Sequence, residues 1–237
     1  MSSLLQAILE RTDVWRGAAP AGAAPSITSG FPALDAALPG GGWPTGCLVE
    51  ILPRHEGIGE LRLLGPALAG LSRGGRCLAW IAPPHLPYAP ALAAAGIDPA
   101  RLLVVRTRSP QETLWATEQA LRAAACGAVL AWPAAARYPD LRRLQLAAEK
   151  GEGLAVLFRA PQLRAEASPA PLRLALDTAN GGLAVHVLKR RGAPLAAPVL
   201  LQQPIVARPA AADPADHAVD RDQPSAAAAR DSRRAHA

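Results

Sequence analysis

The stretch that decides the fold is CLVEILPRHEGIGELRLL, residues 47–64. Residues 47–52 are apolar except for one glutamate, and such a run predicts a buried β-strand. A polar, glycine-containing loop follows at 53–59, and apolar residues then recur at helical spacing over 61–71. A strand, a glycine loop and a helix in this order are the elements from which proteins build a backbone cradle for phosphate. The sequence therefore predicts a phosphate-loop position after this strand.

Around this stretch, short apolar segments alternate with segments of helical periodicity. The alternation predicts a three-layer α/β/α fold whose mostly parallel sheet is covered by helices on both faces. Two further strands, 172–177 and 183–189, flank Asn180-Gly181-Gly182 and predict a hairpin on one edge of the sheet. The other expected strands lie at 76–82, 102–106, 128–132 and 154–159, and the expected helices at 31–38, 87–95, 109–125 and 139–150.

The chain divides into three parts by composition. Residues 1–25 are predicted to form an amphipathic helix (3–16) and a Gly/Ala/Pro linker, and the α/β domain is expected over 26–203. Residues 204–237 are rich in Ala, Pro, Asp and Arg without apolar periodicity, which predicts a disordered tail. The apolar face of the predicted helix carries Leu4, Leu5, Ile8 and Leu9.

Charge and cysteine content narrow the functional classes. The net charge of +6 comes from 25 basic and 19 acidic residues without a long basic block, so it is compatible with DNA or an acidic partner but does not establish either. Cys47, Cys77 and Cys126 are widely spaced, so we expect buried, reduced thiols and neither a zinc site nor a disulfide framework. No apolar run approaches the roughly 20 residues that span a bilayer, and we expect a cytoplasmic protein.

The loop departs from an ATP-binding motif where the chemistry requires particular side chains. A phosphate loop ends in Gly-Lys-Ser/Thr, because the lysine contacts the terminal phosphates and the hydroxyl binds magnesium. Here the loop contains Gly57 and Gly59. Gly59 stands for the second glycine of the motif, and Glu60 and Leu61 follow it. A carboxylate would repel a triphosphate, and an alkyl group cannot bind a metal. These four residues predict a degenerate loop without ATP hydrolysis, cofactor or metal.

The residues around this loop resemble RecA. Residues 27–51 are similar to the RecA segment that leads into its phosphate loop, and the similarity continues at 75–81 and 95–103 within about 26–190. However, Pro83-Pro84-His85 stands where the catalytic glutamate of RecA would follow a strand, and Trp132-Pro133 where an aspartate would hold magnesium. Three elements of the ATPase are therefore missing together, which implies that the catalytic site has been abandoned.

This combination resembles the SulA/ImuA branch of the RecA-like superfamily, and its RecA-like N-terminal part favours the ImuA family within that branch. Residues 157–159 and 187–194 also fit. The resemblance implies a non-catalytic adaptor in SOS-induced translesion DNA synthesis. The implied partners are ImuB, which is an inactive Y-family polymerase relative, and an error-prone replicative-type polymerase, with DNA as a further contact. The alternatives are a SulA-like inhibitor of cell division that binds FtsZ and an atypical RecA-like ATPase.

Two further groups of residues are candidates for function. Lys189, Arg190 and Arg191 end the last predicted strand, where they form either a contact for a partner or nucleic acid or a solvated strand end. The tryptophans are predicted to pack in the core or at strand ends, and Trp80 and Trp132 to fill space that a nucleotide would otherwise occupy. The four tryptophans in question are Trp43, Trp80, Trp115 and Trp132.

Overall fold

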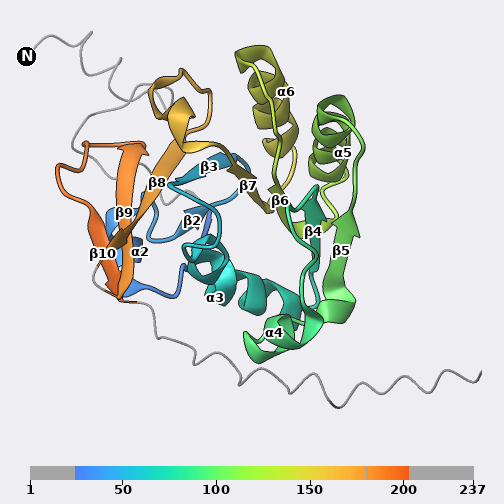
Figure 1. Ribbon diagram of the computed structural model, residues 1–237, viewed down its shortest axis with the longest axis horizontal. Helices are drawn as coiled ribbons and strands as arrows, with labels where there is room; N and C mark the ends of the chain where they lie inside the picture. Colours follow the sequence, from blue (N-terminus) through green and yellow to red (C-terminus); the bar gives the residue numbers. More distant parts are fainter. Residues whose placement is uncertain (1–24, 180, 203–237) are drawn as a thin grey trace, which may run out of the picture. The chain divides into compact units, whose positions relative to one another are not determined.

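The computed structural model describes residues 25–179 and 181–202, so the predicted helix at 3–16 and the predicted tail at 204–237 lie outside the described residues. The helices are α2 (Pro32–Ala37), α3 (Glu60–Arg73), α4 (Ala89–Ala94), α5 (Pro110–Arg122) and α6 (Tyr138–Ala148), with short 3-10 helices η1 (Pro99–Arg101) and η2 (Pro161–Ala165) (Figure 1). The strands are β1 (Ser26–Ile27), β2 (Trp43–Pro44), β3 (Leu48–Pro53), β4 (Cys77–Ile81), β5 (Leu102–Val105), β6 (Cys126–Ala131), β7 (Leu154–Phe158), β8 (Leu172–Ala179), β9 (Gly182–Lys189) and β10 (Val199–Gln202).

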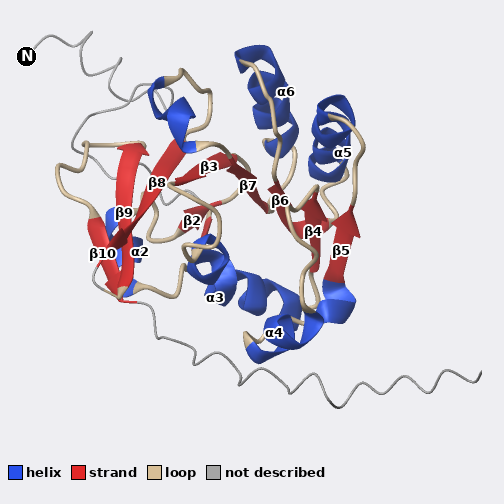
Figure 2. Cartoon of the chain, viewed as in Figure 1, coloured by secondary structure: helices blue, strands red, loops and turns tan. Residues whose placement is uncertain are grey.

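The central feature is an eight-stranded mixed sheet in the order β10-β9-β8-β3-β7-β6-β4-β5 (Figure 2). The strands from β8 to β5 run parallel to one another, and β9 and β10 add antiparallel to β8. Strands connected by helices are expected to be parallel, because the crossover returns the chain to the same end of the sheet. The predicted α/β class and the mostly parallel sheet are therefore confirmed.

Helices cover both faces of the sheet, and each face has its own core. Successive strand residues point to opposite faces. Val49 and Ile51 accordingly lie in the core that contains α3, whereas Leu48 lies in the core that contains α5 and α6. The strands β3 and β7 are buried along their whole length, as expected for central strands between two helical layers.

Local sequence signals explain where the longer helices begin. Ser109 has extended backbone, and its hydroxyl accepts a hydrogen bond from the Glu112 N–H at 3.1 Å, so it is the N-cap of α5. The Glu112 carboxylate accepts from the Arg108 N–H at 2.7 Å, so it returns to the residue before the cap. Across the helices, Glu118 of α5 pairs with Arg143 of α6, which holds the two helices side by side (Figure 1).

Two predictions are wrong in detail, and one small sheet was not predicted. The hairpin of β8 and β9 is not at the sheet edge, because β10 pairs antiparallel with β9 and forms that edge. Trp115 is not in the core: it lies on the outer face of α5 and is 62% exposed. The small sheet of β1 and β2 was not predicted, because two-residue strands are too short to show periodicity. Within the described ranges, no helix is long and apolar enough to cross a membrane.

Candidate functional site

The loop between β3 and α3 lies at the carboxyl edge of the parallel strands, which is where open α/β sheets place their ligand sites. Gly57 and Gly59 both adopt positive φ, 77° and 118°. A residue with a side chain rarely adopts these angles, so the two glycines set the course of the loop. Gly59 is also the N-cap of α3, and no side chain caps the helix at this position. The loop therefore brings backbone N–H groups together at the positive end of a helix, where an anion is favoured.

The anion at this position is supplied by the chain itself. The Glu60 Oε1 accepts a hydrogen bond from the Gly57 N–H at 2.9 Å, and its Oε2 accepts from the Gly59 N–H at 3.1 Å. One carboxylate thus engages two of the amides that would line a phosphate cradle. Three of the four predicted residues are brought together in this way, while the Leu61 side chain is 36% exposed. Glu60 is not merely a repulsive substitution, because it occupies the amides as a ligand would.

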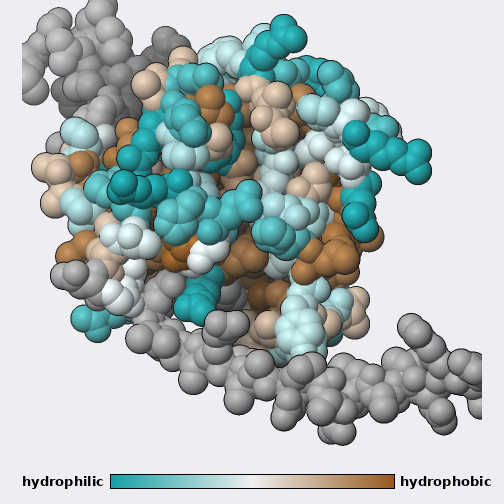
Figure 3. All heavy atoms as spheres, in the orientation of Figure 1, coloured by the Kyte–Doolittle hydropathy of each residue, from teal (hydrophilic) through white to brown (hydrophobic). Residues whose placement is uncertain are grey.

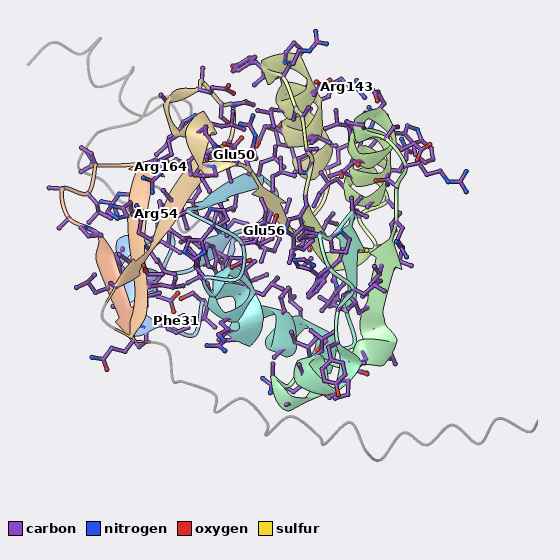
Figure 4. All side chains as sticks on the ribbon, in the orientation of Figure 1. Phe31, Glu50, Arg54, Glu56, Arg143 and Arg164 are labelled. Carbon is purple, nitrogen blue, oxygen red and sulfur yellow. The ribbon has the colours of Figure 1, made fainter. Side chains whose placement is uncertain are left out.

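The cation of the loop is also engaged within the chain. Arg54 directly follows β3 and lies 3.6 Å from the Asp177 carboxylate on β8, which also contacts Arg164 at 3.0 Å and His186 at 3.3 Å. Figure 4 shows Arg54 and Arg164 close to one another in this region. The hydrogen bond from Arg164 lowers the pKa of Asp177, although partial desolvation opposes the shift. Asp177 therefore stays ionised at neutral pH and gathers three basic side chains beside the loop.

Aromatic side chains pack across the carboxyl ends of the neighbouring strands. Trp132, directly after β6, stacks on Phe158 of β7 with ring centroids 4.7 Å apart and contacts Trp80 of β4 at 5.9 Å. Trp80 is 2% exposed, and its Nε1 has no hydrogen-bond partner among the described residues. These contacts confirm the predicted packing role of Trp80 and Trp132. That they fill the space of a nucleotide stays a prediction.

A buried ionic cluster that was not predicted from the sequence lies beneath the loop after β7. Glu50 is fully buried in β3 and contacts Arg159 at 3.4 Å and Arg173 at 2.8 Å, while the Ser168 hydroxyl donates to it at 2.6 Å. Arg173 also donates to the carbonyls of Leu163, Arg164 and Glu166, and Arg159 to that of Ala136. The cluster therefore fixes η2 and the segment after it to three strands of the sheet. One signal was present in the sequence. A charged residue stands in or directly after three apolar strand segments: Glu50 in β3, Arg159 after β7 and Arg173 in β8.

The basic strand end is only partly free. The Lys189 Nζ donates to the Ser168 carbonyl at 2.8 Å, and Arg190 donates to the carbonyls of Ala193 at 2.6 Å and of Ala37 at the end of α2. Arg191 is exposed. The three residues therefore do not form a uniform charged surface, because Arg190 links the end of β9 to α2. Their predicted role as a contact for partners or DNA stays a prediction.

Two of the three cysteines are neighbours. Cys77 and Cys126 face each other in the register of β4 and β6, and both are half-buried, whereas Cys47 is buried. Burial, together with the neighbouring Cys77 thiol, raises the pKa of Cys126 to about 11. The thiolate is the reactive form of cysteine. Cys126 is therefore held as an unreactive thiol at neutral pH. The prediction of buried thiols is confirmed for Cys47 but not for Cys77 and Cys126, which are only half-buried.

Parts of the chain are similar to known proteins. The family model "Cell division inhibitor SulA" matches residues 46–155. Protein ImuA from two strains of Caulobacter vibrioides is 37% identical over a match that covers 56% of this chain and 57% of ImuA. The cell division inhibitor SulA of Edwardsiella piscicida is 32% identical over a match that covers 46% of this chain and 64% of that protein. The chain thus matches less than two thirds of the length of each relative.

Fold and loop together define a class: an α/β protein with a mostly parallel sheet whose glycine loop is occupied by its own carboxylate. The sequence comparisons are more specific than the fold, because both ImuA and SulA are similar to parts of this chain. Over about half of its length, the chain is similar to ImuA and to the cell division inhibitor SulA.

Proposed function

We propose that this protein is a non-catalytic adaptor in DNA damage-induced mutagenesis, built on a RecA-like core whose nucleotide site is closed. The observation that carries the proposal is the Glu60 carboxylate on the Gly57 and Gly59 amides. The order β3, glycine loop and α3 is that of a phosphate-binding loop, and the similarity to ImuA supports a role in the damage response. The expected partners are an ImuB-type inactive polymerase relative and an error-prone replicative-type polymerase, with DNA as a further contact.

The closed loop supports the non-catalytic part of this proposal energetically. A phosphate group would have to displace Glu60 from the amides and would then lie near the released carboxylate. Two unit charges about 4 Å apart repel by about 1 kcal/mol in water and by about 4 kcal/mol at the effective dielectric of a protein surface. The residues after the neighbouring strands are Ala82 after β4 and Trp132 after β6, and neither side chain can bind magnesium or activate water.

Exposed apolar side chains near the closed site support a binding role. Leu86 and Tyr88 follow β4 and are each 69% exposed, and Tyr138, which begins α6 after β6, is 52% exposed. Arg106, Arg108 and Arg137 are exposed on the connections that follow β5 and β6. Aromatic and arginine side chains are enriched where proteins bind one another. We therefore assign the partner contact to the carboxyl edge of β4, β5 and β6.

Co-purification from damage-induced cells tests the proposal. The tagged chain should bring down the ImuB-type protein, and the Leu86→Ala/Tyr88→Ala variant should bring down at least about tenfold less, since a lost hot-spot side chain is worth about 2 kcal/mol. Leu188→Ala/Leu200→Ala is the matched control, because these residues are exposed on β9 and β10 at the opposite end of the sheet. Magnesium-dependent ATP hydrolysis by the wild type, lost in a Gly59→Val variant, would contradict the non-catalytic role.

A second function has its own support, because the SulA family model matches residues 46–155. A SulA-like inhibitor of cell division would bind FtsZ. The same co-purification separates the two functions: recovery of FtsZ without the ImuB-type protein, together with filamentous cells on overproduction, would favour this alternative.

A further inference from the structure

An apolar groove lies between the first described strand and α3, away from the closed loop. It has a volume of about 200 Å³ and is lined by Ile27, Thr28, Pro66, Ala67, Gly70, Leu71, Gly74 and Arg76. A cavity of about 150 Å³ lined by apolar side chains holds benzene. The groove is therefore large enough for an aliphatic or aromatic side chain from another segment. Figure 3 shows apolar (brown) surface in the region of α3, α4 and β5.

The helix that forms one wall of this groove is unusually open. Gly70 is an exposed residue in the interior of α3, and a Cβ placed on it would meet nothing within 4 Å. Glycine weakens the interior of a helix, and it commonly stands where another chain segment approaches closely. At Gly30, by contrast, a Cβ would lie 2.5 Å from Pro66, so the segment after β1 already packs tightly on α3. Gly30 thus contacts α3 at Pro66, but both Pro66 and Gly70 remain exposed on this surface of the helix.

The groove begins where the described chain begins. Ile27 and Thr28 line it, and the first described residue is Pro25. The 24 preceding residues include 3–16, with Leu4, Leu5, Ile8 and Leu9 at helical spacing. A linker over 17–25 separates this apolar face from the groove, and nine residues can span up to about 30 Å. An apolar face and an apolar groove are therefore tethered within easy reach of each other.

We infer that residues 3–16 of this chain dock by their apolar face in the groove between β1 and α3 of the same molecule. The tether favours the intramolecular contact, since a short flexible linker gives an effective concentration in the millimolar range. The contact would cover apolar surface at Gly70 and the neighbouring residues. It is independent of the proposed adaptor role, because it involves neither the closed loop nor the carboxyl edge of the sheet.

Photo-crosslinking in the full chain tests this docking. Benzoylphenylalanine is placed at Thr12, which shares the predicted helical face of Leu5 and Ile8. Equal amounts of ¹⁵N-labelled and unlabelled chain are mixed, irradiated and analysed by mass spectrometry. We expect crosslinks to residues 66–76 in peptide pairs of a single isotope. Pairs of mixed isotope would show that a second copy occupies the groove, and crosslinks to other parts of the chain would show that the segment docks elsewhere. Either result overturns the inference.

Two matched glycine variants test the groove. Gly70→Leu fills it, and Gly65→Leu places the same side chain on α3 at a position that also has open space but does not line the groove. We expect Gly70→Leu to reduce the crosslink yield about tenfold, as for loss of one buried leucine, and to speed amide exchange over 3–16. Gly65→Leu should do neither. Leu5→Asp/Ile8→Asp changes only the segment and should have the same effect as Gly70→Leu. Equal yields in all of these variants would overturn the docking.

Discussion

Glu50 and Glu60 are ten residues apart and carry the same functional group, but their roles differ. Glu50 lies inside the sheet, where Arg159, Arg173 and Ser168 satisfy it without solvent. Glu60 lies at the protein surface, where two loop amides satisfy it. The first holds three strands and a long loop together, so it belongs to the architecture. The second stands where a ligand would bind, so its effect is on binding. Burial, and not residue type, separates the two roles.

The largest effect is expected from Glu50→Gln. The amide keeps the shape of the side chain but removes the charge that balances Arg159 and Arg173. Breaking a buried ion pair costs about 3–5 kcal/mol, because Arg173 then stays buried without a counter-ion, whereas Arg159 keeps Glu166 at 3.4 Å. Chemical denaturation should show this loss of unfolding free energy. Glu152→Gln, at an exposed position, is the control and should change it by less than about 0.5 kcal/mol. Equal stability of the two variants would mean that water reaches the cluster.

A smaller loss is expected from Trp132→Ala. Trp132 is partly exposed but stacks on Phe158 at 4.7 Å. Truncating a fully buried tryptophan costs about 3–5 kcal/mol, so we expect about 2 kcal/mol at this half-buried site. Trp115→Ala removes the same side chain from a position that is 62% exposed, and it should be nearly neutral. Thermal unfolding of the two variants side by side tests whether the aromatic row at the carboxyl edge stabilises the fold.

Glu60→Ala should cost still less stability, about 1 kcal/mol, because the two amides can bond to water once the carboxylate is gone. The matched control is Glu56→Ala, which removes the same charge from the same loop and breaks only an exposed contact with His85 at 3.4 Å. If Glu60 closes the loop, the affinity for inorganic phosphate measured by calorimetry should rise in Glu60→Ala and not in Glu56→Ala. Unchanged phosphate binding in both would separate the loop from anion recognition.

The smallest effect is expected at the basic strand end. Lys189→Ala/Arg191→Ala should change the unfolding free energy by less than about 0.5 kcal/mol, as is usual at exposed positions. Adding Arg190→Ala should cost about 1 kcal/mol more, because Arg190 donates to the carbonyls of Ala37 and Ala193. A loss of partner or DNA binding in the double variant would locate a contact here. A fully active double variant would leave these charges as a solvated strand end.

The alternation of strands and helices could be predicted because it depends on local periodicity, and the structure confirms it from β3 to β9. The departure of the loop from a phosphate motif was equally local, since Glu60 directly follows Gly59. The ionic cluster could not be predicted from local periodicity, because Arg159 and Arg173 are 109 and 123 residues from Glu50 in the sequence. Strand β10 was not predicted, and Trp115 shows that an aromatic residue in an amphipathic helix can face outward.

A carboxylate that belongs to the chain differs from a dissolved anion in one respect: its local concentration at the loop is fixed by the covalent structure. Glu60 is only one and three residues from the amides that it contacts, so its effective concentration there is at least in the millimolar range and does not vary with the surroundings. A dissolved phosphate would have to compete with this constant occupant. We therefore expect the conformation of the loop to be insensitive to moderate changes in phosphate concentration.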